Sequence, residues 1–223
     1  MIKKTSFSGI YKEETQKGMQ LFTRNLAPGH KVYDEFLVED NGIEYRSWNP
    51  HKSKLAAAIH NKIAQTGIKT GQSLLYLGAA SGTTVSHVSD IIGPEGQLFA
   101  VEISPTVMRD LVFMSEQRSN IAPILADASK PESYFHRVFQ VDTVYQDIAQ
   151  RSQVEILMRN VSLLLKPGGN IVLAVKARSM DVTANPKAVF EHAREELEKR
   201  IKIADWKLLE PFEKDHMLVV GRL

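Results

Sequence analysis

The sequence predicts an α/β fold in which a doubly wound parallel sheet carries an antiparallel edge hairpin and follows a small β-rich domain. Three observations lead to this prediction. From residue 73 onward, short apolar runs alternate with amphipathic segments, as in strands and helices of a parallel sheet. The last two strand-like runs have no long helix between them, so we expect them to pair antiparallel. Residues 1–48 contain only short strand-like runs and turns, so we expect two domains, 1–48 and 49–223.

The N-terminal domain is expected to be a small sheet. Asp40-Asn41-Gly42 carries the Asn-Gly pair of a tight hairpin, which would join strands at 36–39 and 43–48. Because so small a sheet buries little by itself, it should pack on the larger domain or on a partner. A homodimer through this domain is one such arrangement.

A helix is expected after this sheet. Asn49-Pro50 would begin it, because Asn suits the N-cap and Pro suits the first turn. Apolar residues recur at helical spacing from Leu55 to Ile63, and Gly67 would end the segment.

Residues 73–84 are the centre of the predicted sheet. Leu74 to Leu77 form the continuous apolar run of a strand buried on both faces. Gly78 and Gly82 allow a tight turn and close approach of a ligand, and a helix is expected over 83–92. A strand, a glycine turn and a helix N-terminus form a nucleotide cradle, because unpaired N–H groups point at whatever binds.

Glu102 indicates the kind of nucleotide. It ends the next strand, about 20 residues past Gly82, where a carboxylate accepts hydrogen bonds from a ribose diol. The spacing is not G-x-G-x-x-G, because Ala80 stands where the second glycine would be, and the chain has no Tyr-x-x-x-Lys pair. S-adenosylmethionine is therefore favoured. A nicotinamide dehydrogenase and a turn without ligand are the alternatives.

The remaining segments complete the sheet. Strands are expected at 97–101, 122–125, 141–146, 171–175, 205–209 and 217–221, and helices at 104–118, 152–165 and from 185 onward, with a turn at 167–169. This pattern suits a Rossmann-like methyltransferase sheet, in which ligands gather at the carboxyl ends of the strands. The residues expected at that edge are Gly78, Glu102, Asp127, Asp147 and Lys176.

Composition excludes several classes of protein. A net charge of +2 rules out a chain-wide basic field, so a local patch or partner proteins must hold any nucleic acid. The lack of cysteine excludes disulfides and Cys-based metal sites and suits a cytoplasmic protein. The seven histidines have no ligand spacing, so no metal site is expected. No apolar run approaches the roughly 20 residues of a membrane span.

Four segments closely resemble the fibrillarin family: residues 23–29 (TRNLAPG), 48–59 (WNPHKSKLAAAI), 82–90 (GTTVSHVSD) and 213–216 (EKDH). The likeness runs from about Gly9 to the C-terminus. Because the chain has no Gly/Arg-rich arm, it resembles the compact archaeal form of the family. The resemblance implies an S-adenosylmethionine-dependent RNA 2′-O-ribose methyltransferase acting on rRNA and tRNA, the catalytic subunit of a box C/D guide ribonucleoprotein. It also implies a Nop-type scaffold protein, a kink-turn-binding protein, a box C/D guide RNA and a substrate RNA as partners.

The resemblance also implies the site residues. The cofactor set would be Gly78, Ala80, Gly82, Thr83, Thr84, Glu102, Ile103, Asp127, Ala128, Asp147 and Gln150. Within it, Ala80, Thr83 and Thr84 would lie at the methionine moiety, Glu102 at the ribose, Asp127 and Ala128 at the adenine, and Asp147 and Gln150 at the methyl-bearing end. The catalytic tetrad would be Lys54, Asp147, Lys176 and His216. The chain departs from the family pattern at Arg151, where Pro is usual, and at Ile103, where an aromatic residue is usual.

Two roles for Lys176 follow from the chemistry. A sulfonium methyl is already activated, so the site mainly needs to place the ribose oxygen in line with it. Lys176 would accept the 2′-hydroxyl proton if neutral, or stabilise the developing alkoxide as a cation while water takes the proton. Asp147 would orient Lys176, while Lys54 and His216 would steady the target phosphate and ribose; a capping role is the alternative for His216. Methylation of a protein glutamine and a non-catalytic assembly role are the alternative functions.

Overall fold

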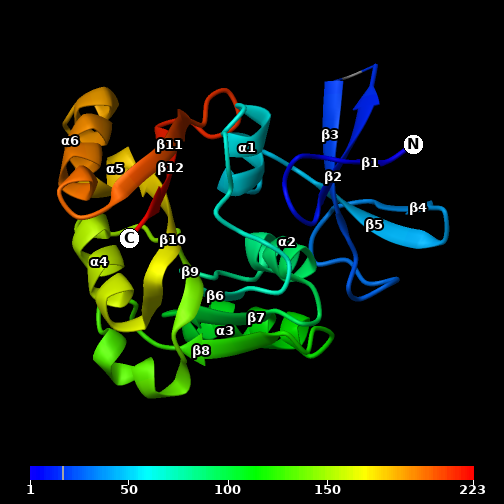
Figure 1. Ribbon diagram of the computed structural model, residues 1–223, viewed down its shortest axis with the longest axis horizontal. Helices are drawn as coiled ribbons and strands as arrows, with labels where there is room; N and C mark the ends of the chain where they lie inside the picture. Colours follow the sequence, from blue (N-terminus) through cyan, green and yellow to red (C-terminus); the bar gives the residue numbers. More distant parts are fainter. Residues whose placement is uncertain (17) are drawn as a thin grey trace.

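The computed structural model describes residues 1–16 and 18–223 and contains two sheets (Figure 1). The N-terminal sheet has the strand order β1-β2-β3-β5-β4 and is antiparallel throughout. Its strands are β1 (Lys3–Lys4), β2 (Ile10–Thr15), β3 (Gly18–Arg24), β4 (Leu37–Asp40) and β5 (Ile43–Trp48). The expected hairpin is confirmed: Asn41 and Gly42 have φ of 54° and 74°, the left-handed pair that a two-residue turn requires.

The second sheet has the order β11-β12-β10-β9-β6-β7-β8. Its strands are β6 (Ser73–Leu77), β7 (Gln97–Glu102), β8 (Ile121–Leu125), β9 (Val141–Gln146), β10 (Leu165–Lys176), β11 (Lys202–Leu208) and β12 (His216–Arg222). Strands β6 to β10 are parallel, whereas β12 is antiparallel to both of its neighbours. The predicted doubly wound sheet with an antiparallel edge hairpin is thus confirmed.

The predicted boundaries of two elements, the first helix and β10, are wrong. The first helix begins at Lys54, not at Asn49, because the Asn49 side chain accepts the amide of His51 and closes a turn there. It ends at His60, since Lys62 has a left-handed φ of 60°. Strand β10 is longer than expected, because its bounds include the turn at 167–169, around which its pairing with β9 shifts register.

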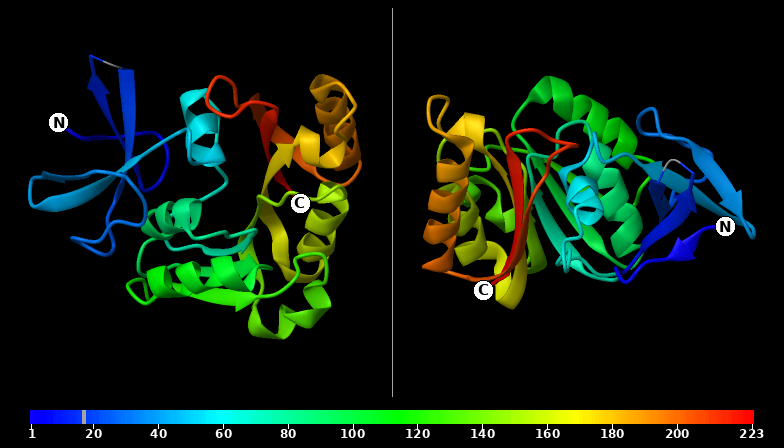
Figure 2. Two further views of the ribbon diagram at one scale, coloured as in Figure 1. Left: turned by 180° about the vertical axis from the view of Figure 1, so that it is seen from behind. Right: turned by 90° about the horizontal axis from the view of Figure 1, so that it is seen from above.

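Helices cover both faces of the larger sheet (Figure 2). The helices are α1 (Lys54–His60), α2 (Thr83–Ile92), α3 (Pro105–Ser115), α4 (Gln153–Leu164), α5 (Ala177–Met180) and α6 (Pro186–Glu198), with short 3₁₀ turns at Pro131–Ser133 and Phe135–Arg137. Alternation along β6 divides the core: Leu74 and Tyr76 pack on the side of α1, α2 and α3, and Leu75 and Leu77 on the side of α4 and α6. Trp48 is fully buried in the first of these clusters, so the N-terminal sheet packs on the larger sheet's helical layer.

The sheet order determines where a ligand can enter. Strand β6 lies between β7 and β9, so the connections after β6 and after β9 lead to opposite faces. A crevice forms at such a switch point, beyond the carboxyl ends of the strands. The predicted cofactor residues follow β6, β7, β8 and β9, so the fold brings them to this edge.

Candidate active site

A cleft of about 260 Å³ opens at the carboxyl ends of β6 to β9. Its lining includes most of the predicted cofactor residues: Gly78, Ala80, Glu102, Ile103, Asp127, Ala128, Asp147 and Gln150. Ser129, Ile148, Ala149 and Ile156 also line it, and sequence reasoning missed them. Gly82, Thr83 and Thr84 lie in the adjoining turn and the start of α2, outside this lining.

The turn after β6 explains the need for Gly78. Its φ is +84°, and a Cβ there would overlap the carbonyl oxygen of Asp147 and lie 2.8 Å from Cγ2 of Ile148. The close approach that requires glycine is therefore made by the 147–148 segment. The Asp147 amide in turn donates to the Leu77 carbonyl at 2.9 Å, which ties this segment to the end of β6.

Glu102 is held in one orientation at the cleft. Its Oε2 accepts the Ala80 amide at 2.9 Å, and its Oε1 accepts the amides of Ile103 and Ser104 at 3.0 and 2.9 Å. Ala80 itself has a left-handed φ of 49°, so the Glu102 carboxylate stabilises a strained turn. A carboxylate offers about four lone-pair positions, which leaves room for a ribose hydroxyl.

Asp127 follows β8 on the adenine side of the predicted site. Its Oδ1 accepts both the amide and the hydroxyl of Ser129, at 2.9 and 2.7 Å. Both hydrogen bonds lower the pKa of Asp127, the one from the Ser129 hydroxyl more than the one from the amide, and keep the carboxylate ionised at neutral pH. The Asp-x-Ser spacing, typical of such turns, could have pointed to Ser129 from the sequence.

Lys54 and Asp147 meet beside the cleft although 93 residues separate them. Lys54 Nζ lies 2.9 Å from Oδ2 of Asp147, and the two side chains are 18% and 21% exposed. Lys54 is the first residue of α1, and its neighbour Ser53 accepts a hydrogen bond from the Thr84 hydroxyl at 3.1 Å. The starts of α1 and α2 and the end of β9 therefore converge on one ion pair.

Lys176 and His216 face each other across β10 and β12 as register partners. The Lys176 backbone is fixed by Gln153, whose side chain bonds both its amide and its carbonyl at 3.2 Å. Among residues 1–16 and 18–223, none forms a hydrogen bond or ion pair with Lys176 Nζ. The structure thus pairs Asp147 with Lys54 and leaves the Lys176 ammonium available.

His216 is partly buried, and its Nδ1 donates to the Lys214 carbonyl at 2.7 Å. Burial, and then the nearby Lys54 cation, lower the pKa of His216, so the ring is neutral at pH 7. Its other ring nitrogen is therefore an acceptor. His216 thus lies within electrostatic reach of Lys54 and pairs with Lys176 in the sheet.

Of the two departures from the family pattern, Ile103 lines the cleft, whereas Arg151 only follows a residue that lines it. Gln150 lines the cleft although Arg151 follows it, so the loop does not need Pro at that place to bring Gln150 there. Ile103 also lines the cleft and is 57% exposed, which gives the rim an apolar surface without an aromatic ring.

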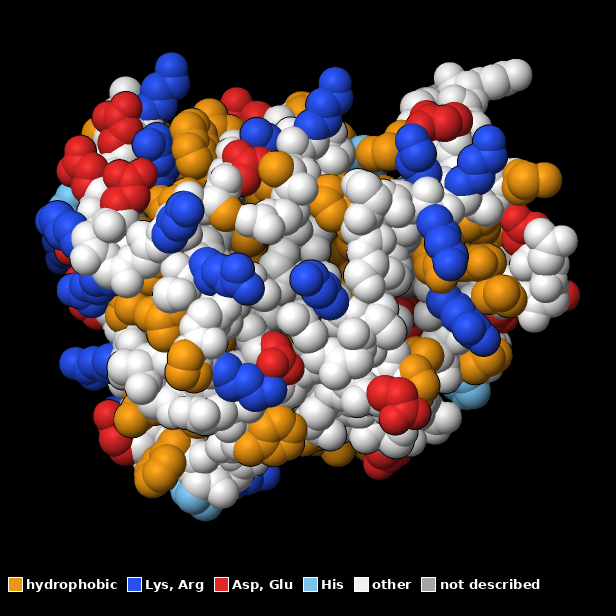
Figure 3. All heavy atoms as spheres, in the orientation of Figure 1, with side chains coloured by type: hydrophobic (Ala, Val, Ile, Leu, Met, Phe, Trp, Pro, Cys, Tyr) orange, Lys and Arg blue, Asp and Glu red, His pale blue; other side chains and the backbone are white. Residues whose placement is uncertain are grey.

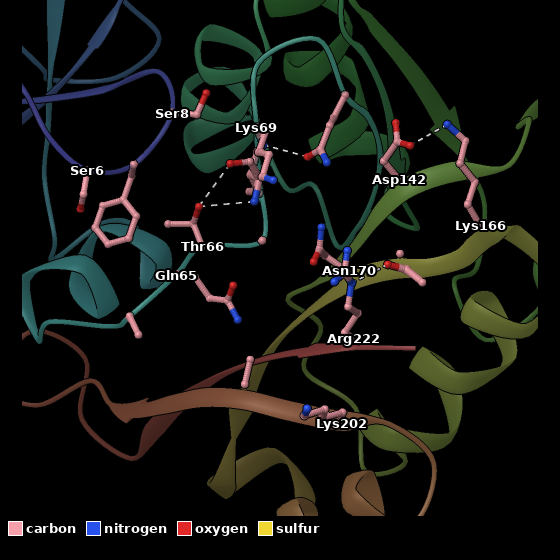
Figure 4. Close-up of a pocket in the computed structure, with 18 of the residues that line it drawn as sticks. Ser6, Ser8, Gln65, Thr66, Lys69, Asp142, Lys166, Asn170, Lys202 and Arg222 are labelled. Atoms are coloured by element: carbon pink, nitrogen blue, oxygen red, sulfur yellow. Dashed lines mark hydrogen bonds and ion pairs between the residues drawn. The ribbon is translucent and has the colours of Figure 1, made fainter.

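A larger hollow of about 720 Å³ lies at the opposite edge of the sheet (Figure 4). It is formed by the N-terminal loop, the segment before β6 and the strand ends that carry Asn170, Lys202 and Arg222. None of the predicted site residues lines it, so it is separate from the cofactor cleft. The described residues contain no cluster of His, Asp and Glu placed to hold a metal ion, and no helix among them is long and apolar enough to cross a membrane.

The fold and the site together define a class of protein. A doubly wound sheet with an inserted antiparallel strand, a glycine turn after β6 and an acidic residue at the end of β7 are typical of Rossmann-like S-adenosylmethionine-dependent methyltransferases.

Comparison with known proteins identifies the family. The chain belongs to the fibrillarin family, whose model matches residues 1–223. It is 49% identical over 222 residues to the fibrillarin-like rRNA/tRNA 2′-O-methyltransferase of Thermococcus sibiricus, covering 99% of this chain and 98% of the relative. A crystal structure of Aeropyrum pernix fibrillarin with natively bound S-adenosyl-L-methionine is 43% identical with a TM-score of 0.91, covering 99% and 97%. The fibrillarin chain of a fibrillarin/Nop5p complex is 40% identical with a TM-score of 0.87, covering 99% and 100%.

Proposed function

We propose that this chain is an S-adenosylmethionine-dependent RNA 2′-O-methyltransferase acting on rRNA and tRNA. The observation that carries the proposal is the Lys54–Asp147 pair, which stands beside a cleft lined by the expected cofactor residues. The Thermococcus sibiricus relative bears the name of this activity, and the Aeropyrum pernix structure contains the cofactor.

The cleft residues fit the cofactor. Glu102 would accept the ribose hydroxyls, and the ionised Asp127 would accept the adenine amino group. Gly78 and Ala80 would line the turn beside the methionine moiety, while Asp147 and Gln150 would lie at the methyl-bearing end. When bound, S-adenosylmethionine supplies a methyl group that is activated by its sulfonium.

Lys176 would act on the ribose 2′-hydroxyl. Its ammonium has no partner among the described residues, so it can hydrogen-bond the attacking oxygen. As a cation it would stabilise the charge that develops while water removes the proton; as a neutral amine it would take the proton itself. The neutral His216 would hold the ribose by hydrogen bonding, and Lys54, fixed by Asp147, would contact the target phosphate.

RNA recognition would depend on partners. On the face shown in Figure 3, Lys and Arg side chains are scattered among acidic ones and form no continuous basic stripe. The related fibrillarin/Nop5p complex supports a Nop-type scaffold. We include a kink-turn-binding protein and a box C/D guide RNA in the assembly, so that base pairing selects the nucleotide. The chain itself would consist of two domains, residues 1–48 and 49–223. The first of these domains could also form the contact of a homodimer.

A reconstituted methylation assay tests this function. Radiolabelled methyl transfer to a substrate RNA is measured with scaffold, kink-turn protein and guide RNA present, and then with each one omitted. We expect site-specific transfer only in the complete mixture. Efficient site-specific methylation by the chain alone would contradict the dependence on partners, and label in protein instead of RNA would favour the glutamine methyltransferase.

A further inference from the structure

Arg46 lies fully buried at the seam between the N-terminal sheet and α2. Its Nε and Nη2 donate to Oε1 of Glu35 at 2.9 and 2.7 Å. On the α2 side, Nη1 donates to Oδ2 of Asp90 at 3.0 Å and Nη2 donates to Oγ of Ser86 at 3.0 Å. One guanidinium therefore joins β5 of the small sheet to two successive turns of α2.

Asp90 makes the α2 side of this contact rigid. Besides Arg46, it accepts hydrogen bonds from the Thr23 hydroxyl at 2.8 Å, the Leu26 amide at 3.0 Å and Arg118 at 2.5 Å. The seam holds two carboxylates and two guanidiniums, so the buried charges balance. A buried ionic network gains little net stability over apolar packing, but it fixes the relative position of its members.

The neighbouring His87 fills the rest of the seam. Its ring stacks on Trp48, with centroids 4.9 Å apart, and its nitrogens bond the hydroxyls of Thr23 and Tyr33 at 2.7 Å each. Consecutive turns of α2 are thus anchored in the N-terminal sheet through Ser86, His87 and Asp90.

Helix α2 connects the seam to the turn beside the cleft. The helix begins with Thr83 and Thr84, the residues expected at the methionine moiety. The Thr84 hydroxyl donates to Ser53, and the next residue, Lys54, binds Asp147. Side-chain contacts, joined by the backbone of α2 and of residues 53–54, therefore link the N-terminal sheet to the Lys54–Asp147 ion pair.

We propose that Arg46 is a positioning residue of the methyl-transfer site, which fixes α2 so that Thr83 and Thr84 face the cofactor and Ser53 keeps Lys54 on Asp147. The N-terminal sheet is then part of the framework of the cofactor cleft. This inference rests on the proposed function, because the proposed function assigns the cofactor to that cleft.

The test uses a charge-balanced double variant of the full chain, Glu35→Gln with Arg46→Met. It removes one carboxylate and one guanidinium together, so Asp90 stays paired with Arg118. The matched control is Asp142→Asn with Lys166→Met, an ion pair at the opposite edge of the sheet. Circular dichroism establishes the folded state of each variant, and calorimetric titration with S-adenosylmethionine measures its affinity.

We expect the double variant to bind the cofactor about tenfold or more weakly while folded, and the control to stay within about twofold of the wild type. Ser86→Ala removes one neutral contact of Arg46 together with the hydrogen bond from the Ser86 hydroxyl to the Thr83 carbonyl. If the double variant does not fold, Ser86→Ala is the deciding variant, with about a threefold loss expected. The inference is overturned if the folded double variant binds the cofactor with wild-type affinity. It is also overturned if Ser86→Ala, used as the deciding variant, binds with wild-type affinity, or if the control loses as much affinity as the double variant. A wild-type chain that binds no cofactor would instead overturn the proposed function itself.

Discussion

Lys176 has two proposed roles in methyl transfer, and substitutions can separate them. Its ammonium has no partner among the described residues, and its backbone is held by Gln153. We expect Lys176→Ala to lower methyl transfer in the assembled particle by about 10²-fold or more, because either role of Lys176 is lost. Cofactor affinity should hardly change, since Lys176 does not line the cleft. Methylation kinetics and calorimetric titration measure the two effects.

Lys176→Arg separates the two roles. Arginine stays protonated, so it retains a cation but cannot act as a base. Substantial residual transfer would support the cationic clamp, and loss equal to that of Lys176→Ala would support the base. Full turnover by the Ala variant would contradict both.

His87 gives the seam a predictable pH dependence. Complete burial, and then the cations Arg46 and Arg118, lower the pKa of His87 well below its ordinary value. Around pH 6 the unfolded state therefore binds a proton that the folded state does not. The stabilisation is complete above the unfolded pKa of about 6.5 and is lost as pH falls below it.

We expect the free energy of unfolding to fall with decreasing pH between about 6.5 and 5, by up to about 1.4 kcal/mol per pH unit from this group. His87→Gln should make the dependence flatter, because Gln does not titrate. Urea unfolding at several pH values measures it, and His192→Gln is the control, since its exposed side chain lies outside the seam. An unchanged slope in His87→Gln would show that His87 is not the source.

At the scale of elements, the turn between β6 and α2 determines the shape of the cleft. Gly78 and Gly71 have similar φ values of +84° and +80°, but only Gly78 has atoms within 4 Å of the Cβ position. Gly71→Ala therefore measures backbone strain alone, and Gly78→Ala adds an overlap with the Asp147 carbonyl.

We expect Gly71→Ala to lower the free energy of unfolding by about 1 kcal/mol and Gly78→Ala by roughly 2–4 kcal/mol. Only Gly78→Ala should also weaken cofactor binding, because it displaces the segment that carries Asp147. Urea unfolding and calorimetric titration give both quantities. Equal effects of the two substitutions would mean that the overlap is relieved at no cost.

At the scale of the whole molecule, the two sheets should unfold together. Trp48 belongs to the same core cluster as α1 and α2, and the Arg46–Asp90 contact is fully buried. Unfolding the N-terminal sheet alone would break the contact of Arg46 with α2 and expose the apolar surface that Trp48 covers, both of which cost free energy. We expect a single calorimetric transition whose van't Hoff and calorimetric enthalpies agree. Two resolved transitions would show that the sheets are energetically independent.

The sequence by itself determined the order of strands and helices and the type of cleft. Helix α2 has the predicted bounds, Thr83 to Ile92, because a glycine turn begins it and Gly93 ends it. Glu102 and Asp127 could be predicted because they follow apolar runs whose carboxyl ends must share one edge. These features depend on local patterns and on a general rule for parallel sheets.

Only the tertiary structure decided which side chains meet. Sequence reasoning placed Lys54 and Asp147 in one site but expected Asp147 to orient Lys176; the fold pairs Asp147 with Lys54 instead. It also missed Arg46, which lies in a strand whose local pattern says nothing about a helix 40 residues away. The reason is physical: periodicity fixes the face on which a side chain lies, but ion pairs and buried networks depend on distances between elements that local sequence does not specify.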